Sequence, residues 1–343
     1  MKAGSGIRNG VITGGTWCAD HNKIVERWPG EDDLVEILKE EVRGGGSACN
    51  LGINLKRLDP QFAVSTIGLV GDDEDGRILL AEADAAGIER SRLEVVAEAR
   101  TNYTDAFTSS SSGRRTHLFH AGTSALLTPE HFDFSEIDAR ILHLGLPGIH
   151  AQLDAAWGAD ANGWVTVLKK ARAAGIETNL ELCSIPAERI AAIVRPCLAH
   201  LDLLIINDFE IAAIAGKPAG HEGDVDLAAC REAAQAVFAQ GAMRFLAVHF
   251  PGGAIALTRD GDEIRKPSVA VPPEAVVGAN GAGDAFAAGV LYGLHEGWSY
   301  GEAIALGHAA AATSIRSLGT TDAVESWQQC LEFASECGWR NPI

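Results

Sequence analysis

The stretch Gly281-Ala282-Gly283-Asp284, followed by an alanine-rich run from Ala285 to Leu294, is the most informative part of this sequence. Three small residues at the start of a helix allow backbone N–H groups to approach an anion closely. The aspartate that follows can accept a proton from a hydroxyl group. Together these features suit phosphoryl transfer, in which the amides neutralise charge on the moving group. The simpler alternative is a glycine turn that caps a helix, with Asp284 near its positive end.

The overall composition is typical of a soluble globular protein with an acidic surface. The 343 residues are 47% apolar and 22% charged, and the formal net charge is −18. This charge argues against nucleic acid or an anionic membrane as a partner, but a local anion site with Mg²⁺ can still hold a nucleotide. Seven scattered cysteines without C-x-x-C predict reduced thiols in a cytoplasm. Met1 to Gly10 has no apolar run, so a signal peptide is not expected.

Short β-like runs alternate with helical patterns along most of the chain. The expected strands cover 11–13, 62–68, 141–144, 177–182, 203–206 and 245–249, and the expected helices cover 47–58, 77–86, 165–174, 187–194 and 227–240. This alternation predicts an α/β fold with a mostly parallel sheet and helices on both of its faces. The segments 22–43 and 102–120 are polar and β-leaning instead. A hairpin around Arg114-Arg115 is expected, and both segments are predicted to form a small sheet that stands off the core.

A second glycine-rich motif, Arg43-Gly44-Gly45-Gly46, precedes the helical pattern that contains Asn50. Consecutive glycines let the backbone approach a ligand closely. The Asn50 amide can both donate to and accept from substrate hydroxyls. An ordinary loop-to-helix turn with a polar surface asparagine is the alternative.

A third motif, Asn207-Asp208-Phe209-Glu210, follows the apolar strand at 203–206. Polar side chains at the carboxyl end of a strand in an open α/β sheet usually face the ligand crevice. Asn207 and Glu210 share one helix face and can hold a hydrated Mg²⁺. A capping box at a helix start is the simpler alternative, and in isolation it is favoured.

The three motifs, in this order and spacing, resemble the PfkB-type carbohydrate kinases, whose fold is ribokinase-like. Gly278 to Phe286 matches the family's D-T-x-G-A-G-D-A-F, Gly45, Gly46 and Asn50 match G-G-x-x-x-N, and Asn207 and Glu210 match N-x-x-E. The resemblance implies a three-layer α/β/α sandwich with a mostly parallel central sheet and a small β-sheet lid. It also implies a core of residues 9–19, 44–100 and 121–330, a lid of 20–43 and 101–120, and a tail of 331–343 packed on the core.

The resemblance also implies a role for each matching position. Asp284 is the expected catalytic base, and the amides of Gly281, Ala282 and Gly283 are the expected anion hole. The remaining implied residues are Asp20, Gly45, Gly46, Asn50, Thr101 and Arg115 for substrate, Asn179, Asn207, His249, Gly253, Asn280 and His308 for nucleotide, and Glu210 for Mg²⁺ through water. For His308, on an alanine-rich helix, a packing role is the simpler alternative.

The activity that the resemblance implies is ATP-dependent phosphorylation of an alcohol group on a small sugar, sugar acid or nucleoside, with Mg²⁺ as cofactor. A homodimer through the lid is compatible with it. Gly278 and Ala279 replace the family's aspartate and threonine, so activation by a monovalent cation is not expected. Glu181 stands where an arginine is common, and His249 to Gly253 replace T-x-G-x-x-G. This altered nucleotide loop leaves an alternative: a non-catalytic polyol-binding or regulatory protein on the same scaffold. A structural role through the lid sheet is a further alternative.

Overall fold

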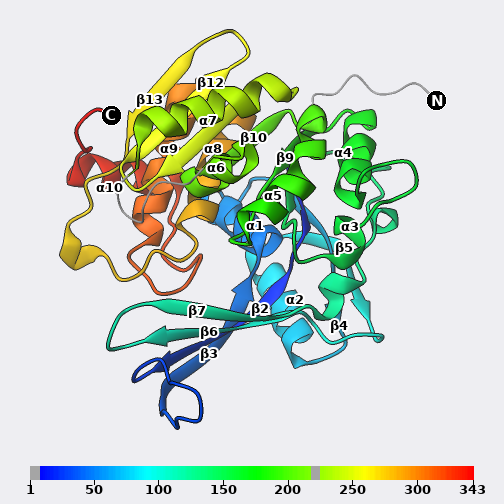
Figure 1. The fold of residues 1–343 in the computed structure, drawn as a ribbon, viewed down its shortest axis with the longest axis vertical. Helices are drawn as coiled ribbons and strands as arrows, with labels where there is room; N and C mark the ends of the chain where they lie inside the picture. Colours follow the sequence, from blue (N-terminus) through cyan, green and yellow to red (C-terminus); the bar gives the residue numbers. More distant parts are fainter. Residues whose placement is uncertain (1–7, 218–224) are drawn as a thin grey trace.

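The centre of the protein is a parallel β-sheet in a computed structural model that describes residues 8–217 and 225–343 (Figure 1). Residues 1–7, on which most of the signal-peptide prediction rests, lie outside the described part. The sheet has the order β5-β4-β1-β8-β9, and all neighbouring strands are parallel. Its strands are β1 (Val11–Gly15), β4 (Val64–Gly71), β5 (Glu89–Val96), β8 (Ile141–Gly145) and β9 (Glu177–Leu180).

A second sheet continues the layer beyond β9. Its order is β10-β11-β12-β13, with β10 parallel to β11 and the last two pairs antiparallel. A hydrogen bond from Asp202 N–H to the Thr178 carbonyl (3.1 Å) links the start of β10 to β9. The strands are β10 (Leu203–Asn207), β11 (Phe245–Phe250), β12 (Gly253–Thr258) and β13 (Glu263–Pro267).

Helices cover both faces of this layer, because successive strand residues point to opposite sides. Val11 packs into one apolar cluster with α1, α2, α8, α9 and α10, whereas Ile12 packs into another with α3 to α7. The helices are α1 (Ser47–Leu58), α2 (Glu74–Ala86), α3 (Ala151–Asp154), α4 (Gly163–Ala173), α5 (Ala187–Val194), α6 (Asp208–Ala215), α7 (Leu227–Gln240), α8 (Ala282–His295), α9 (Tyr300–Ser314) and α10 (Trp327–Cys337), with 3₁₀ turns at Gly122–Ala125, Pro129–His131, Arg195–His200 and Pro273–Ala275. The predicted three-layer α/β/α arrangement is confirmed.

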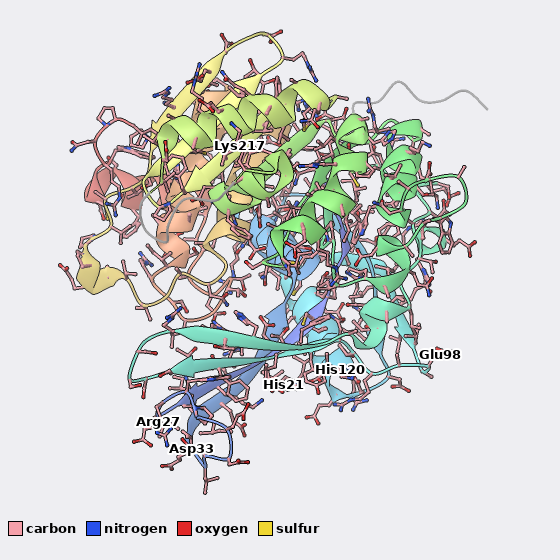
Figure 2. All side chains as sticks on the ribbon, viewed as in Figure 1. His21, Arg27, Asp33, Glu98, His120 and Lys217 are labelled. Carbon is pink, nitrogen blue, oxygen red and sulfur yellow. The ribbon has the colours of Figure 1, made fainter. Side chains whose placement is uncertain are left out.

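The predicted lid is a separate four-stranded sheet below the core in Figure 1. Its strands are β2 (Cys18–Val25), β3 (Ile37–Gly45), β6 (Tyr103–Ser109) and β7 (Arg115–His120), in the order β3-β2-β6-β7. The central pair β2 and β6 is parallel, and both outer pairs are antiparallel. Arg27 and Asp33 form an ion pair (2.8 Å) at the far tip (Figure 2). The predicted hairpin at Arg114-Arg115 joins β6 to β7.

Several elements have the predicted bounds, and others differ for local reasons. The helices at 47–58, 187–194 and 227–240 agree with the structure. The helix predicted from residue 77 begins at Glu74, because the Asp73 carboxylate caps it by accepting from Gly76 N–H (2.8 Å). The tail is anchored to the core by a bridge between Val269 and Trp339. In the described part of the chain, no helix combines the length and apolar character that a bilayer crossing requires.

Candidate functional site

The start of helix α8 is held in an unusual backbone conformation. Gly281 is the N-cap with φ of 74°, a left-handed value that favours glycine. A Cβ atom at this position would lie 2.5 Å from the Thr320 carbonyl oxygen, so the loop after α9 also requires glycine here. No side chain of the described residues caps α8, and Ala282 N–H has only a long contact to the Ala279 carbonyl (3.4 Å). The first turn therefore retains donor capacity for an anionic ligand.

Asp284, in the first turn of α8, is oriented by a two-step hydrogen-bond chain. Asn50 Nδ2 of helix α1 donates to Asp284 Oδ2 (3.2 Å), and Thr320 Oγ1 donates to Asn50 Oδ1 (3.0 Å). Thr320 thus fixes which end of the Asn50 amide faces the carboxylate. Asp284 itself is half-buried, so it is neither sealed in the core nor on the outer surface. This arrangement suits a group that reacts with a bound ligand.

The glycine motif before α1 lies directly against the lid. Gly46 has φ of 83° and sits close to Thr16, where a Cβ atom would clash with the Thr16 carbonyl oxygen (2.7 Å). The Asp20 carboxylate occupies the space where a side chain on Gly45 would have to go. The motif therefore brings the Asp20 side chain of β2 next to the backbone that leads into the helix of Asn50.

Asp20 of β2 and Arg115 of β7 lie on the lid close enough for their charges to interact. Burial raises the pKa of Asp20 to about 6, although the nearby Arg115 guanidinium opposes this shift and Asp284 adds to it. The Arg115 side chain also donates to Asn22 Oδ1. These mutual effects place Asp20, Arg115 and Asp284 in one electrostatic neighbourhood. Four predicted residues, Asp20, Gly45, Asn50 and Asp284, are thus brought together.

Glu181 adds a second carboxyl group beside Asp284. Burial is the main cause that raises the pKa of Asp284 well above its usual value, and the adjacent Glu181, which hydrogen-bonds to it, is the next. Burial also raises the pKa of Glu181 to about 7. On its other side, Glu181 Oε2 lies 2.5 Å from His143 Nε2, and burial lowers the pKa of His143 to about 4. A neutral His143 ring therefore lies against the Glu181 carboxyl group.

Asn207 and Glu210 form a reciprocal capping box at the start of α6. Asn207 Oδ1 accepts from Glu210 N–H (2.8 Å), and Glu210 Oε2 accepts from Asn207 N–H (2.9 Å). The simpler alternative is therefore present in the structure, and it also fixes the buried Glu210 carboxyl group, whose pKa burial raises to about 7. Among the described residues, no cluster of three acidic, histidine or cysteine side chains could hold a metal directly. These oxygens fit Mg²⁺ only through water, which is how this ion often binds.

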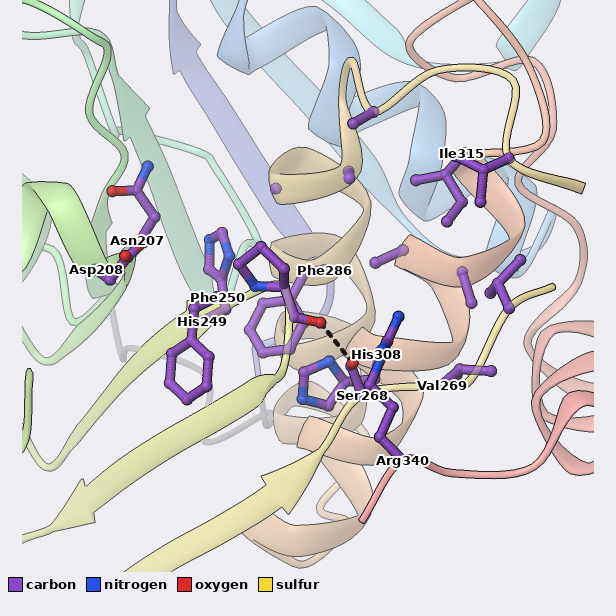
Figure 3. Close-up of a pocket in the computed structure, with 18 of the residues that line it drawn as sticks. Asn207, Asp208, His249, Phe250, Ser268, Val269, Phe286, His308, Ile315 and Arg340 are labelled. Atoms are coloured by element: carbon purple, nitrogen blue, oxygen red, sulfur yellow. Dashed lines mark hydrogen bonds between the residues drawn. The ribbon is translucent and has the colours of Figure 1, made fainter. Parts of the chain in front are cut away.

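A largely apolar cavity of about 520 Å³ adjoins the start of α8 (Figure 3). Ala282 and Gly283 line it on one side, while Asp284 turns toward Asn50 on the other. Its further walls come from α6, β11, α9 and the segment after β13, with Asn207, His249, Phe286, Ser268 and His308 among the lining residues. The size is in the usual range for a small-molecule site. The start of α8 thus separates this cavity from the carboxylate cluster.

Four predicted site residues do not line this cavity. Thr101 is fully buried, and its hydroxyl donates to Asp73 Oδ1 (2.7 Å) and accepts from Gly71 N–H (2.8 Å), so it anchors the lid hinge. Asn179 is fully buried and donates to His143 Nδ1 (3.0 Å). Gly253 is buried in the β12–β13 pairing. Neither it nor Asn280 lines the cavity, although Ala279, the neighbour of Asn280, does.

Two residues of the site were not predicted. Glu181, one residue beyond the end of β9 and two positions after Asn179, lies beside Asp284. Thr320 links Gly281 to Asn50 from a loop more than 30 residues beyond the glycine motif. Glu181 lies close in sequence to the predicted Asn179, which is a weak sequence signal. No sequence pattern points to Thr320.

The buried carboxyl group of Glu181 predicts a pH-dependent stability. Because its pKa is about 7 in the folded chain and 4.5 in the reference state, folding binds a proton between these values. The stabilisation is complete below pH 4.5 and is lost as the pH rises through 7. Glu181→Gln is therefore expected to exceed the wild type at pH 8 by about 1–3 kcal/mol in the free energy of unfolding, with little difference at pH 4.5.

Urea unfolding at pH 4.5 and pH 8 measures this difference. The matched control is Glu332→Gln, which removes an exposed glutamate of α10 and should follow the wild type at both pH values. Parallel pH dependences for Glu181→Gln and the wild type would show that Glu181 is ionised in the same range whether folded or not.

Comparison with known proteins gives one consistent result. The sequence model for "pfkB family carbohydrate kinase" matches residues 10–327. The chain is 28% identical over 305 residues to a 5-dehydro-2-deoxygluconokinase of Geobacillus thermodenitrificans, covering 87% of this chain and 86% of that protein.

Solved structures agree in fold. Arabidopsis thaliana ribokinase, complexed with ribose and ATP, superposes with a TM-score of 0.78 at 20% identity, covering 95% of this chain and 99% of that one. A Burkholderia thailandensis nucleoside kinase in complex with inosine superposes with a TM-score of 0.72 at 18% identity, covering 97% and 100%. At these identities, the structural likeness shows that the fold is shared.

Proposed function

Because the chain belongs to the pfkB family of carbohydrate kinases, we propose that it transfers the γ-phosphoryl group of ATP to an alcohol group of a small sugar, sugar acid or nucleoside. The observation that carries this proposal is the position of Asp284. Its carboxylate faces Asn50 and the lid, while the preceding residues Ala282 and Gly283 line the large cavity. A proton acceptor and a set of free amides thus meet at the start of one helix.

Asp284 acts in the proposed mechanism as the general base. The substrate lies between the lid and the core, where Asp20, Asn50 and the backbone at Gly45 and Gly46 bind its hydroxyl groups. Asp284 accepts the proton of the reacting hydroxyl as its oxygen attacks the γ-phosphorus. The Asn50 and Thr320 chain holds the carboxylate in position for this step. Closure of the lid excludes water and limits hydrolysis of ATP.

The phosphates of ATP lie in this proposal at the start of α8. The amides of Gly281, Ala282 and Gly283 stabilise the charge on the transferred group. Bound Mg²⁺ supplies further positive charge at the phosphates, and Glu210 with Asn207 would hold it through water. The base and ribose occupy the cavity that His249, Phe286 and His308 line.

The experiment that tests the proposal is ADP release from Mg-ATP over a panel of sugars, sugar acids and nucleosides. The expected result is substrate-dependent release with at least one member of the panel, while the same acceptors give roughly 10²–10⁴-fold slower release with Asp284→Asn. Equal release by both proteins would remove Asp284 from the chemistry. The compounds that support release also identify the substrate class. In this proposal, lid side chains such as Arg115 determine that class.

A non-catalytic polyol-binding role is the second candidate, and the altered loop at His249 to Gly253 is the observation that favours it. Burial lowers the pKa of His249 to about 4, so the loop offers a neutral ring where the family has a hydroxyl. This candidate predicts that a polyol binds with no release of ADP. The cavity and the oriented carboxylate favour the enzyme.

The loop before α8 leads to a prediction about monovalent cations. Gly278 and Ala279 offer no side-chain oxygen, although the family has an aspartate and a threonine at these positions. We therefore expect kcat to change less than about twofold when Na⁺ replaces K⁺ at constant ionic strength, because the loop lacks two side-chain oxygens that would add to backbone carbonyls in binding a hard cation. Initial rates in the two salts measure this, and activation of several fold by K⁺ would contradict it.

We also propose a homodimer through the lid and a cytoplasmic location. The lid has edge strands β3 and β7 that could pair with a second copy. It carries many exposed large apolar side chains: Trp28, Leu34, Ile37, Leu38, Val42, Leu118 and Phe119. All seven cysteines are free, which fits a reducing compartment. Light scattering of the purified protein tests the dimer.

A further inference from the structure

Glu181 and Asp284 bring two carboxyl groups into hydrogen-bond contact beside the start of α8. Glu181 lies one residue beyond the end of β9, and Asp284 lies in the first turn of α8. An ionised carboxylate has acceptor oxygens only, so two carboxyl groups can hydrogen-bond to each other only when one of them carries a proton. The contact therefore requires that the pair hold at least one proton.

The two side chains that flank this pair are electrically neutral. Asn50 Nδ2 donates to Asp284 Oδ2 (3.2 Å). His143 Nε2 lies 2.5 Å from Glu181 Oε2. Asn179 Nδ2 donates to His143 Nδ1 (3.0 Å), so the single hydrogen of this neutral ring is on Nε2. Both flanking side chains thus present an N–H group to the pair, and neither brings a positive charge.

The ionisable groups farther around the pair are mainly acidic. Glu210 of α6 and Asp20 of β2 each interact with it, and burial raises their pKa values to about 7 and about 6. The Arg115 guanidinium acts on Asp20 rather than on the pair. Cys183 adds a neutral thiol, because burial raises its pKa to about 12. A second negative charge on the pair would therefore meet no neutralising cation among these neighbours, and it would repel the phosphates of a bound nucleotide.

We propose that Glu181 and Asp284 form one acid–base unit that holds a single proton between them when ATP is bound, and that Glu181 thereby positions the base and removes one negative charge from the place of phosphoryl transfer. This rests on the proposed function for the role of Asp284 and the position of the phosphates. The acceptor hydroxyl gives its proton to the pair as its oxygen bonds to the γ-phosphorus and the bond from this phosphorus to the β-phosphate oxygen breaks. The pair then holds two protons and releases one to water after ADP leaves.

Two substitutions of similar length separate the hydrogen bond from the proton. Glu181→Gln keeps a group that can hydrogen-bond to Asp284 but does not titrate, whereas Glu181→Met keeps neither property. At pH 6.5 we expect the kcat of Glu181→Gln to lie within about threefold of the wild type. The kcat of Glu181→Met should be lower by about 10-fold or more, with KM for Mg-ATP changed less than about threefold. Circular dichroism shows whether both are folded, and equal kcat in the two folded variants would overturn the positioning role.

The pH dependence shows whether the pair shares a titrating proton. Because this proton is lost as the pH rises through the Glu181 pKa of about 7, the wild type should lose kcat/KM for Mg-ATP at alkaline pH more steeply than Glu181→Gln. The ratio of the variant to the wild type should rise about 10-fold or more between pH 6.5 and pH 8.5. Titration of Glu210 affects both proteins and cancels in this ratio.

Glu188→Gln is the matched control, because it makes the same substitution at an exposed glutamate of α5. Its ratio to the wild type should stay near one at both pH values. A constant ratio for Glu181→Gln, or an equal rise in Glu188→Gln, would overturn the shared proton.

Proton uptake on nucleotide binding tests the inference without catalysis. Calorimetry of a non-hydrolysable ATP analogue with Mg²⁺ at pH 8.5, in two buffers of different ionisation enthalpy, gives the number of protons taken up. The wild type should take up roughly one proton more than Glu181→Gln, because the pair regains its proton beside the phosphates. Equal uptake by the two proteins would overturn the inference.

These measurements also separate the inference from the proposed function. A difference in proton uptake without ADP release from any acceptor would reject the transfer reaction and leave the shared proton intact. ADP release with equal pH dependence and equal proton uptake in the two proteins would reject the shared proton and leave the transfer reaction intact. Failure of the wild type to bind the analogue would overturn both.

Discussion

Asp284→Asn is expected to lower kcat by roughly 10²–10⁴-fold with only a modest change in KM for the acceptor, the scale of losing a general base. The asparagine keeps the size of the side chain and a hydrogen-bonding oxygen for Asn50, which now lies 3.2 Å from the carboxylate. It cannot take up the proton of the attacking hydroxyl. Steady-state kinetics with the best acceptor from the ADP-release panel measure both constants.

Asp322→Asn is the matched control for this prediction. This substitution removes the same charge from the loop that contains Thr320. The Asp322 side chain is exposed and lies outside the site. This variant should have a kcat within about twofold of the wild type, as is usual for an exposed position. Near wild-type turnover by Asp284→Asn would reject the assigned base, and an equal loss in both variants would point to a general charge effect.

Gly281→Ala is expected to lower kcat by about 100-fold and the free energy of unfolding by about 1–3 kcal/mol. The backbone here has φ of 74°, and the added Cβ atom would lie 2.5 Å from the Thr320 carbonyl oxygen. Either the start of α8 or the Thr320 loop must move. Because Thr320 orients Asn50, and Asn50 orients Asp284, the displacement reaches the base as well as the anion-binding amides.

Gly278→Ala provides the comparison within the same loop. Its φ is outside the left-handed region, and its nearest non-neighbouring atom to an added Cβ, the Ser317 carbonyl oxygen, is 3.3 Å away. A small adjustment accommodates the methyl group, so both kcat and stability should stay close to the wild type. Steady-state kinetics give kcat and urea unfolding gives the free energy of unfolding for both variants, Gly281→Ala and Gly278→Ala. Equal behaviour of the two alanines would show that the geometry at Gly281 is unimportant.

The fold could be predicted from the sequence because its strongest signals are local. Alternating apolar runs and helical patterns gave the bounds of the helices at 47–58, 187–194 and 227–240 correctly, and the polar β segments gave the lid. The prediction missed β5 (Glu89–Val96), which is largely exposed and carries many charged residues. Its place in the sheet comes from parallel pairing with β4, a non-local interaction that its own sequence does not reveal.

The expected site residues near the glycine motifs come together in the structure, whereas the surroundings of other expected residues depend on tertiary contacts. Asp284 and Asn50 follow the glycine N-caps of α8 and α1, and the structure brings them together with Asp20 of β2. Asn179 is fully buried against His143, and the sequence pattern did not show that Glu181, two residues later, would lie beside Asp284. Thr101 has a hydroxyl like that of a ligand-binding residue, yet the Asp73 cap uses it at the hinge.

The most direct test of the central claim is a crystal structure with Mg²⁺ and a non-hydrolysable ATP analogue. The account predicts that the γ-phosphate contacts the amides of Gly281 to Gly283, that the base lies by His308, and that the Asp284 carboxylate faces the terminal phosphate from the lid side. A nucleotide bound away from the start of α8, or an Asp284 side chain turned from its phosphates, would contradict the account.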